Sequence, residues 1–139
     1  RKDEYLHLAE FEVSKDAMFL KTEKTLVDAF EKAGFDFVRF SEIDLGTIPR
    51  ETAEDVLLLL VDEERVVRIN EEMFTMKYLM DEAEEKIRKH LENEDVITIA
   101  QVRDMFSTSR KSAKPILEYM DSIKVTKKTG AESERVAYL

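Results

Sequence analysis

The feature that most constrains the fold of this chain is a repeated order of predicted elements. Twice along the sequence, the hydrophobic spacing predicts a helix, a short strand, further helix and a closing pair of strands. The first copy is predicted to have a helix over 24–33, a strand over 37–40, a helix over 49–60 and strands over 66–69 and 73–76. The second copy is predicted to have a helix over 80–91, a strand over 97–99, helices over 100–106 and 109–123, and strands over 125–128 and 135–139.

A single offset of 59 residues aligns apolar positions of the two copies. The aligned pairs are Val38 with Ile97, Phe40 with Ile99, Ile43 with Val102, Leu57 with Ile116, Leu58 with Leu117, and Val66 with Val125. A repeat of this length, in which each copy ends in a two-stranded wing, predicts two tandem winged-helix modules. The predicted fold is therefore mainly α with small β-wings, with a lead-in segment over 1–22, a first module over 23–77 and a second module over 78–139.

Composition supports a folded, helix-rich protein. Hydrophobic residues make up 43% of the 139 residues, and there are only three Gly and two Pro. No run of roughly 18 apolar residues exists to span a bilayer, and the opening residues lack the uncharged core of a signal peptide. We therefore expect a cytoplasmic monomer with no membrane partner. Because the sequence begins at Arg1 and not at Met, we also expect it to be a piece of a longer protein.

Charge is divided unevenly along the chain. Residues 1–94 hold 14 basic and 25 acidic residues, whereas residues 95–139 hold 8 basic and 6 acidic ones. The reversal is strongest from Ser107 to Lys128, where six basic residues stand against two acids. An acidic surface repels phosphate, so a nucleic-acid contact is predicted in the second module alone.

The predicted helix over 109–123 carries the candidate contact residues. Arg110, Lys111 and Lys114 lie three or four residues apart and therefore share a helical face. The hydroxyls at 107–109 are predicted to cap this helix, and its first backbone N–H groups could hold a phosphate. Cations at this end oppose the helix dipole, which suggests that they serve a partner. At the offset of 59, the first module has Glu51, Thr52 and Asp55 instead.

Two details of the basic stretch leave alternatives open. Pro115 removes one helical hydrogen bond, so either the regular helix begins near Lys114 or the turn over 109–114 is distorted. Lys127 and Lys128 occupy consecutive strand positions and point to opposite faces, so only one of them can easily share the surface of the helix. A solvated charged face with no partner is the simplest alternative reading of all these cations.

Residues 97–128 also resemble the last winged-helix module of the bacterial selenocysteine-specific elongation factor family, SelB. The matching positions are Thr108-Ser109-Arg110-Lys111, Ala113, Pro115, Leu117-Glu118-Tyr119, Asp121 and Val125-Thr126-Lys127-Lys128. Ser122 and Lys124 depart from the Arg and Gly expected there, and the wing over 129–135 is more acidic than a typical basic wing tip. Residues 1–94 resemble the preceding module of the family only in layout.

The resemblance implies an mRNA-binding piece of a translation factor that recognises a selenocysteine-insertion hairpin during UGA recoding. The implied RNA-binding residues are Ser109, Arg110, Lys111, Lys114, Lys127 and Lys128. The ribosome and selenocysteinyl-tRNA would be partners through the parent protein. GTP and magnesium would bind the missing amino-terminal part and not this piece, which contains no GxxxxGK[ST] loop.

Other chemistries find little support in the sequence. His7 and His90 are far apart, with no Cys or HExxH pattern beside them, so neither a metal site nor a catalytic site is predicted. Two other functions remain open. The acidic first copy favours a protein–protein adaptor built from winged helices. A DNA-binding regulator fits less well, because only one of the two third helices is basic.

Overall fold

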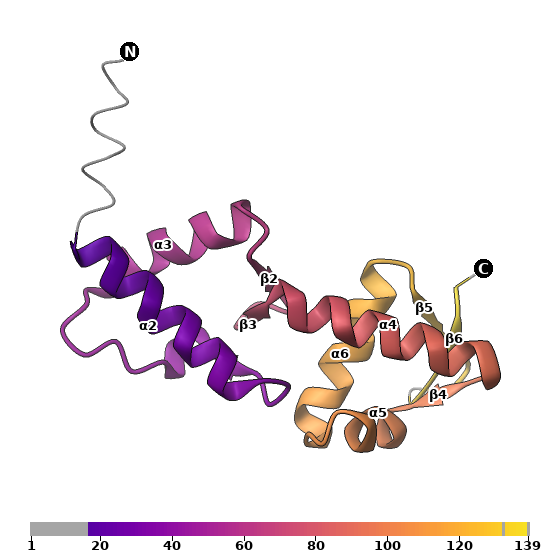
Figure 1. Ribbon diagram of the computed structural model, residues 1–139. Helices are drawn as coiled ribbons and strands as arrows, with labels where there is room; N and C mark the ends of the chain where they lie inside the picture. The colour runs from indigo at the N-terminus through magenta and orange to yellow at the C-terminus, as the bar shows by residue number, and fades with distance from the viewer. Residues whose placement is uncertain (1–16, 132, 139) are drawn as a thin grey trace, which may run out of the picture.

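The structure, a computed structural model, describes residues 17–131 and 133–138 and shows two modules joined end to end (Figure 1). The first module contains α2 (Ala17–Ala33), β1 (Val38–Arg39), the 3-10 helix η1 (Phe40–Glu42), α3 (Arg50–Asp62), β2 (Val66–Arg68) and β3 (Met73–Met76). The second module contains α4 (Lys77–Asn93), β4 (Ile97–Thr98), α5 (Ile99–Met105), α6 (Arg110–Ser122), β5 (Thr126–Lys128) and β6 (Glu134–Ala137). The predicted class, mainly α with two small wings, is confirmed.

The two modules share one sheet topology. Each has a three-stranded antiparallel sheet in which the last strand lies in the middle, in the orders β1-β3-β2 and β4-β6-β5. Val38 pairs with Phe74 in the first sheet, and Ile97 pairs with Arg135 in the second. Phe74 and Arg135 therefore occupy the same place in the two modules.

The structure corrects the alignment of the copies. Strands β1 and β4 do differ by 59 residues, but α3 and α6 span 50–62 and 110–122, which is an offset of 60. Leu58 shows the error: it is 65% exposed, whereas Leu117, its predicted counterpart, is fully buried. The single offset is wrong for the third helices because one more residue separates strand from third helix in the second module. At an offset of 60, buried Leu57 matches Leu117, and exposed Leu58 matches exposed Glu118.

Some element boundaries also differ from the predicted ones. Helix α2 is already formed at Ala17, so it spans the predicted limit at 22/23. The rest of the predicted lead-in segment, together with Leu139, lies outside the described residues. Helix α4 begins at Lys77, directly after β3, and Met76 is its N-cap residue. The limits of the predicted domains stay predictions, but no linker residue separates the last strand of one module from the first helix of the next.

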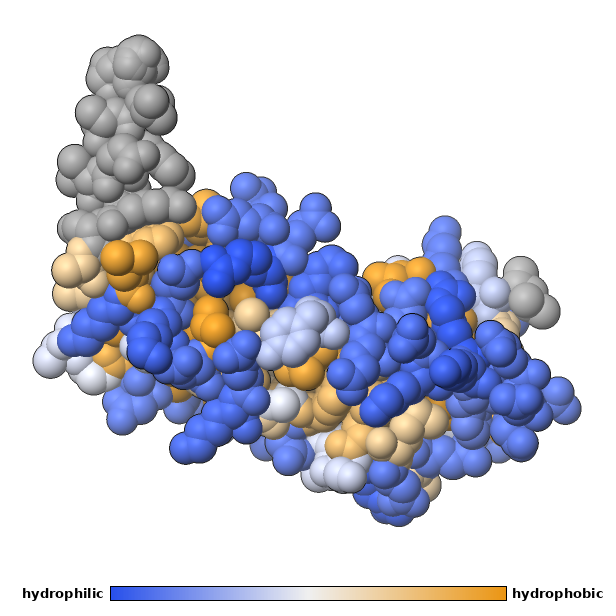
Figure 2. Space-filling view, in the orientation of Figure 1, coloured by the Kyte–Doolittle hydropathy of each residue, from blue (hydrophilic) through white to orange (hydrophobic). Residues whose placement is uncertain are grey.

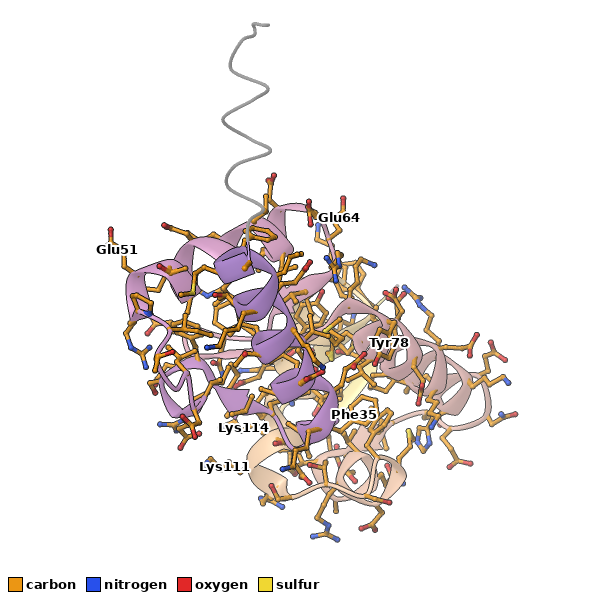
Figure 3. The ribbon with its side chains drawn as sticks, turned by 60° about the vertical axis from the view of Figure 1, so that its left-hand side comes forward. Phe35, Glu51, Glu64, Tyr78, Lys111 and Lys114 are labelled. Atoms are coloured by element: carbon orange, nitrogen blue, oxygen red, sulfur yellow. The ribbon has the colours of Figure 1, made fainter. Side chains whose placement is uncertain are left out.

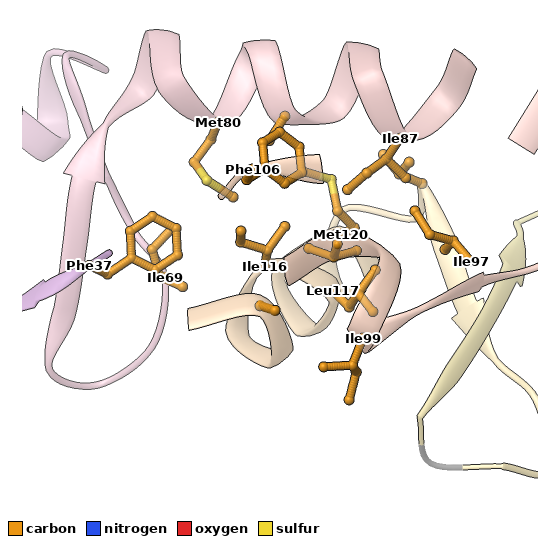
Figure 4. Close-up of a cluster of buried hydrophobic side chains, with 14 of the residues drawn as sticks. Phe37, Ile69, Met80, Ile87, Ile97, Ile99, Phe106, Ile116, Leu117 and Met120 are labelled. Atoms are coloured by element: carbon orange, nitrogen blue, oxygen red, sulfur yellow. The ribbon is translucent and has the colours of Figure 1, made fainter. Parts of the chain in front are cut away.

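The second hydrophobic core extends across both modules. It is built mainly from α4, α5 and α6, with Ile87, Ile97, Ile116, Leu117 and Met120 each fully buried. The first module adds Phe37, Ile69 and Met73 to the same cluster (Figure 4). The first module keeps a separate core of its own around Leu26, Phe30 and Leu60. The second core is therefore shared between the two modules, whereas the first belongs to one module.

Polar and aromatic contacts close the junction between the modules. The rings of Phe35 and Phe106 lie 4.6 Å apart between centroids. The Phe37 N–H donates to the Ser112 hydroxyl at 3.2 Å, and the Thr108 hydroxyl donates to the Phe35 carbonyl at 2.8 Å. Because Thr108 and Ser112 flank the start of α6, these bonds fix that helix against the first module.

A further bond joins α2 to α4. The Tyr78 hydroxyl donates to the Glu31 carboxylate at 2.8 Å. This hydrogen bond raises the pKa of the Tyr78 phenol, which favours the protonated form that donates it.

A buried ion pair ties the second wing to α6. The Arg135 side chain is fully buried, and its Nε lies 2.8 Å from Asp121 Oδ2. The Thr126 hydroxyl donates to Asp121 Oδ1 at 2.6 Å. One carboxylate on α6 therefore holds both strands of the wing, β5 and β6.

We expect Asp121→Ala to lower the free energy of unfolding by about 3 kcal/mol or more, because it leaves the buried Arg135 guanidinium without its carboxylate. Urea denaturation followed by circular dichroism measures this change. Glu118→Ala is the control, since Glu118 is exposed on the same helix, and should change stability by less than about 0.5 kcal/mol. Equal effects of the two substitutions would contradict a stabilising role for the ion pair.

Candidate nucleic-acid interface

The predicted cations of α6 lie on its exposed side. Arg110, Lys111 and Lys114 are all exposed, within the first two turns of the helix. Figure 3 shows Lys111 and Lys114 next to each other at the edge of the molecule. Ala113, Ile116, Leu117 and Met120 face the core, as their spacing predicts. The helix therefore presents a compact positive surface supported by a fully buried opposite face.

The corrected alignment changes the comparison with the first module. At an offset of 60, Arg110 corresponds to Arg50, Lys111 to Glu51 and Lys114 to Glu54, so the predicted matches to Thr52 and Asp55 are wrong. The charge still reverses at two of the three positions. Arg50 lies over the Phe40 ring, with its guanidinium carbon 5.0 Å from the ring centroid. The first module therefore lacks the cluster of three cations.

The start of α6 differs from the predicted arrangement. Ser109 is the N-cap residue, but within the described residues its side chain makes no capping hydrogen bond. The Thr108 hydroxyl is bonded to Phe35 and Asp36 across the junction. The predicted hydroxyl cap is thus wrong, because the neighbouring hydroxyl is used in packing the modules together. Ser109 remains exposed beside Arg110, where its hydroxyl can face a ligand.

Pro115 lies inside a continuous helix. Helix α6 begins at Arg110, five residues before the proline, so the alternative that it begins near Lys114 is wrong. Proline has no N–H to donate to the carbonyl four residues earlier, which belongs to Lys111. The proline itself is buried, on the side of α6 that faces the core.

The register of the wing separates its two lysines. Lys128 pairs with Arg135, and opposite residues of an antiparallel pair share one face of the sheet. Arg135 and Thr126 both bond Asp121 of α6, so that face is the one directed toward the helix. Both lysines are exposed, but Lys128 is on the face toward α6 and Lys127 is on the other. The register therefore gives the sheet face of each lysine, and which of them shares the exposed surface of the helix stays a prediction.

Sequence reasoning missed the residues that position this surface. Thr108 was read only as a possible cap and Ser112 was not considered, although both bond the first module. Arg135 was read as an ordinary strand residue, but it is fully buried against Asp121. The sequence signal that could have indicated a buried partner was Asp121. This acid lies beside the apolar face of its helix, shortly before the predicted strand that begins at Val125-Thr126.

Other kinds of site find no support in the described residues. Among residues 17–131 and 133–138, no group of three or more His, Asp or Glu side chains could hold a metal ion. Within the same ranges, the helices are too short or too polar to cross a membrane.

Comparison with known sequences identifies related proteins. Residues 89–133 match the family model for the winged helix of elongation factor SelB. A selenocysteine-specific elongation factor from Desulfomicrobium baculatum is 34% identical over 82 residues, which cover 57% of this chain and 13% of that protein. The chain thus spans about an eighth of the length of this curated relative.

Two solved structures share the fold. The mRNA-binding domain of elongation factor SelB from E. coli, in complex with SECIS RNA, matches with a TM-score of 0.69 at 18% identity, covering 86% of this chain and 98% of that chain. The crystal structure of the bacterial selenocysteine-specific elongation factor EF-Sec matches with a TM-score of 0.64 at 22% identity, covering 91% of this chain and 19% of that chain.

We expect Thr108→Val to lower the free energy of unfolding by about 1–2 kcal/mol, because it leaves the Phe35 carbonyl without its hydroxyl donor. Ser109→Ala should change it by less than about 0.5 kcal/mol, since that side chain caps nothing. Chemical denaturation of both variants measures the difference. A larger loss in Ser109→Ala would show that its hydroxyl, and not that of Thr108, stabilises the start of α6.

Proposed function

We propose, from the relationship of this chain to the C-terminal winged-helix region of SelB elongation factors, that it binds mRNA during selenocysteine incorporation. The second module would recognise a selenocysteine-insertion hairpin. The observation that carries the proposal is the exposed cluster of Arg110, Lys111 and Lys114 on α6, inside the segment that matches the SelB winged-helix model. The relative from E. coli was solved in complex with SECIS RNA.

The geometry of α6 suits contact with an unpaired RNA loop. Sequence-specific recognition of RNA uses loops and bulges, because the major groove of the A-form helix is too deep and narrow for side chains to read. In our proposal, Arg110, Lys111 and Lys114 contact the hairpin backbone or an extruded base. The Ser109 hydroxyl and the first N–H groups of α6 lie beside a phosphate.

The wing would extend this contact unequally. Lys128 shares the sheet face that is directed toward α6 and would add a second point of contact with the RNA backbone. Lys127 lies on the opposite face and would contact only RNA that passes around the edge of the wing. Removing Lys128 should therefore weaken binding more than removing Lys127.

The parent protein would supply the remaining functions. We propose that this chain is part of a cytoplasmic translation factor whose other regions bind GTP with magnesium, selenocysteinyl-tRNA and the ribosome. The chain itself would tether that factor to the messenger and would carry no catalytic residue. The SelB winged-helix match and the curated relative support this placement.

The first test compares ligands. A selenocysteine-insertion hairpin should bind more tightly than a duplex DNA of equal length, as measured by fluorescence anisotropy. With four cations engaged, the logarithm of affinity should fall against the logarithm of salt concentration with a slope of about −3. Equal, weak binding of both ligands would refute the RNA proposal and favour a protein partner. Preference for the duplex would favour a DNA-binding regulator.

The second test reverses one charge. Lys111→Glu should weaken hairpin binding about tenfold or more, because it replaces a charge-assisted contact with repulsion. Glu51→Gln is a matched control, since it changes the corresponding exposed position of the first module. It should leave the hairpin affinity unchanged. Unfolding curves of both variants verify that the fold is intact, and undiminished binding by the Lys111 variant would reject this site.

A further inference from the structure

The first module has an open apolar groove on the side of α3. Its volume is about 380 Å³, and it is bordered by η1, α3 and the β2–β3 hairpin. The apolar walls are Phe40, Leu57, Leu58, Val61 and Phe74. Leu58 is 65% exposed, more than any other large hydrophobic residue among those described. Figure 2 shows a mainly hydrophilic face with several separate hydrophobic areas, and Leu20 is also 56% exposed. Leu58 differs from these residues because it lines a groove with other apolar side chains.

The second module has different chemistry at the same positions. Phe74 corresponds to Arg135 in the sheet, and Val61 corresponds to Asp121 in the helix. In the second module these two positions form the buried ion pair, and exposed Glu118 replaces Leu58. The groove is therefore not a general consequence of the winged-helix fold. It follows from three apolar residues of the first module at positions where the second has charged ones.

Carboxylates surround the groove. Glu54, Glu71 and Glu72 line it, against one cation, Arg68. The Arg68 guanidinium is held within its own hairpin, because it donates to the carbonyls of Asn70 and Glu71, each at 3.1 Å.

The carboxylates are available to a ligand. Glu72 lies 3.9 Å from Arg39 in an exposed pair, which contributes little. The Glu54 and Glu71 side chains are exposed. Residues 17–76 carry seven basic and fourteen acidic residues, a net charge of −7, which attracts cations over a wider area.

We propose that this groove binds a short basic segment of a partner protein. An apolar side chain of that segment would pack on Leu58 and bury it. The Phe40 and Phe74 rings beside it are each partly covered by a guanidinium, that of Arg50 and that of Arg68. Flanking Lys or Arg side chains would pair with Glu54 and Glu71. RNA is a poor occupant, because the same carboxylates repel phosphate. The chain would therefore hold RNA with the second module and protein with the first.

The two surfaces lie on different parts of the molecule. All the residues that line the groove belong to the first module, whereas Arg110, Lys111 and Lys114 belong to α6 of the second. The two surfaces share no residue, and the proposal does not depend on the RNA-binding one.

A labelled peptide tests the proposal. The probe is a short peptide of lysines interrupted by two leucines, added to the full chain and followed by fluorescence anisotropy and by amide NMR shifts. One control peptide replaces leucine with serine, and another replaces lysine with glutamate. We expect both controls to bind at least tenfold more weakly, and the largest shifts to lie around Leu58 and Phe74. Equal binding of all three peptides, or shifts confined to the second module, would overturn the proposal.

Matched variants separate the groove from the rest of the surface. Leu58→Asn should weaken binding of the lysine-leucine peptide about tenfold, and the double variant Glu54→Gln/Glu71→Gln should weaken it and reduce its salt dependence. Ile123→Asn, at an exposed hydrophobic residue of the second module, should have no effect. An unchanged affinity in Leu58→Asn would overturn the proposal.

Two further measurements distinguish other occupants. Hairpin RNA affinity should be the same in Leu58→Asn and in the unmodified chain; a loss would assign the groove to RNA instead. Sedimentation equilibrium should show a monomer in both. Dimerisation that disappears in Leu58→Asn would show that the groove binds a second copy of this chain, and would also overturn the proposal.

Discussion

The shared apolar junction is the constraint on which the rest of the structure depends. The core of the second module includes three side chains of the first, those of Phe37, Ile69 and Met73. Strand β3 also continues into α4 without a linker. The start of α6 is bonded to the first module through Thr108 and Ser112. A cationic helix would otherwise be free to reorient at the end of a flexible connection. Here its charged face has a fixed direction relative to the preceding module.

The same winged-helix fold carries surfaces of opposite charge in the two modules, because the exposed positions of the third helix can hold different residue types. The buried positions of α3 and α6 agree closely: Leu57 and Leu117 are both enclosed at matching places. The exposed positions diverge, with Glu51 in one module and Lys111 in the other. Substitutions at exposed positions cost little stability, so electrostatic character can change without altering the fold. The modules can therefore take different partners.

The ion pair and the groove show that the residues between helix and wing can also differ between the modules. A buried Arg135 with its carboxylate partner fills the space between helix and wing in the second module, at the cost of removing two charges from water. In the first module, Phe74 and Val61 take those places and leave an open apolar surface next to Leu58. The charged version ties the wing to the helix that would bind RNA. The apolar version leaves a surface whose exposure has no evident role in folding.

Much of this architecture could be predicted from the sequence alone. Local hydrophobic spacing determined the order of the helices and strands, including the wings. It also determined which face of the third helix carries Arg110 and Lys111. Such patterns depend only on residues that are neighbours along the chain. The tertiary structure decided what depends on strand register and on contacts between elements. It shifted the alignment of the third helices by one residue, paired Thr108 with Phe35, and placed Lys128 but not Lys127 on the face toward α6. Contacts between residues more than 70 positions apart leave no periodic signal in the sequence. The sequence by itself therefore determined which residues of each helix are exposed. Only the folded chain decided how the two modules are fixed to one another.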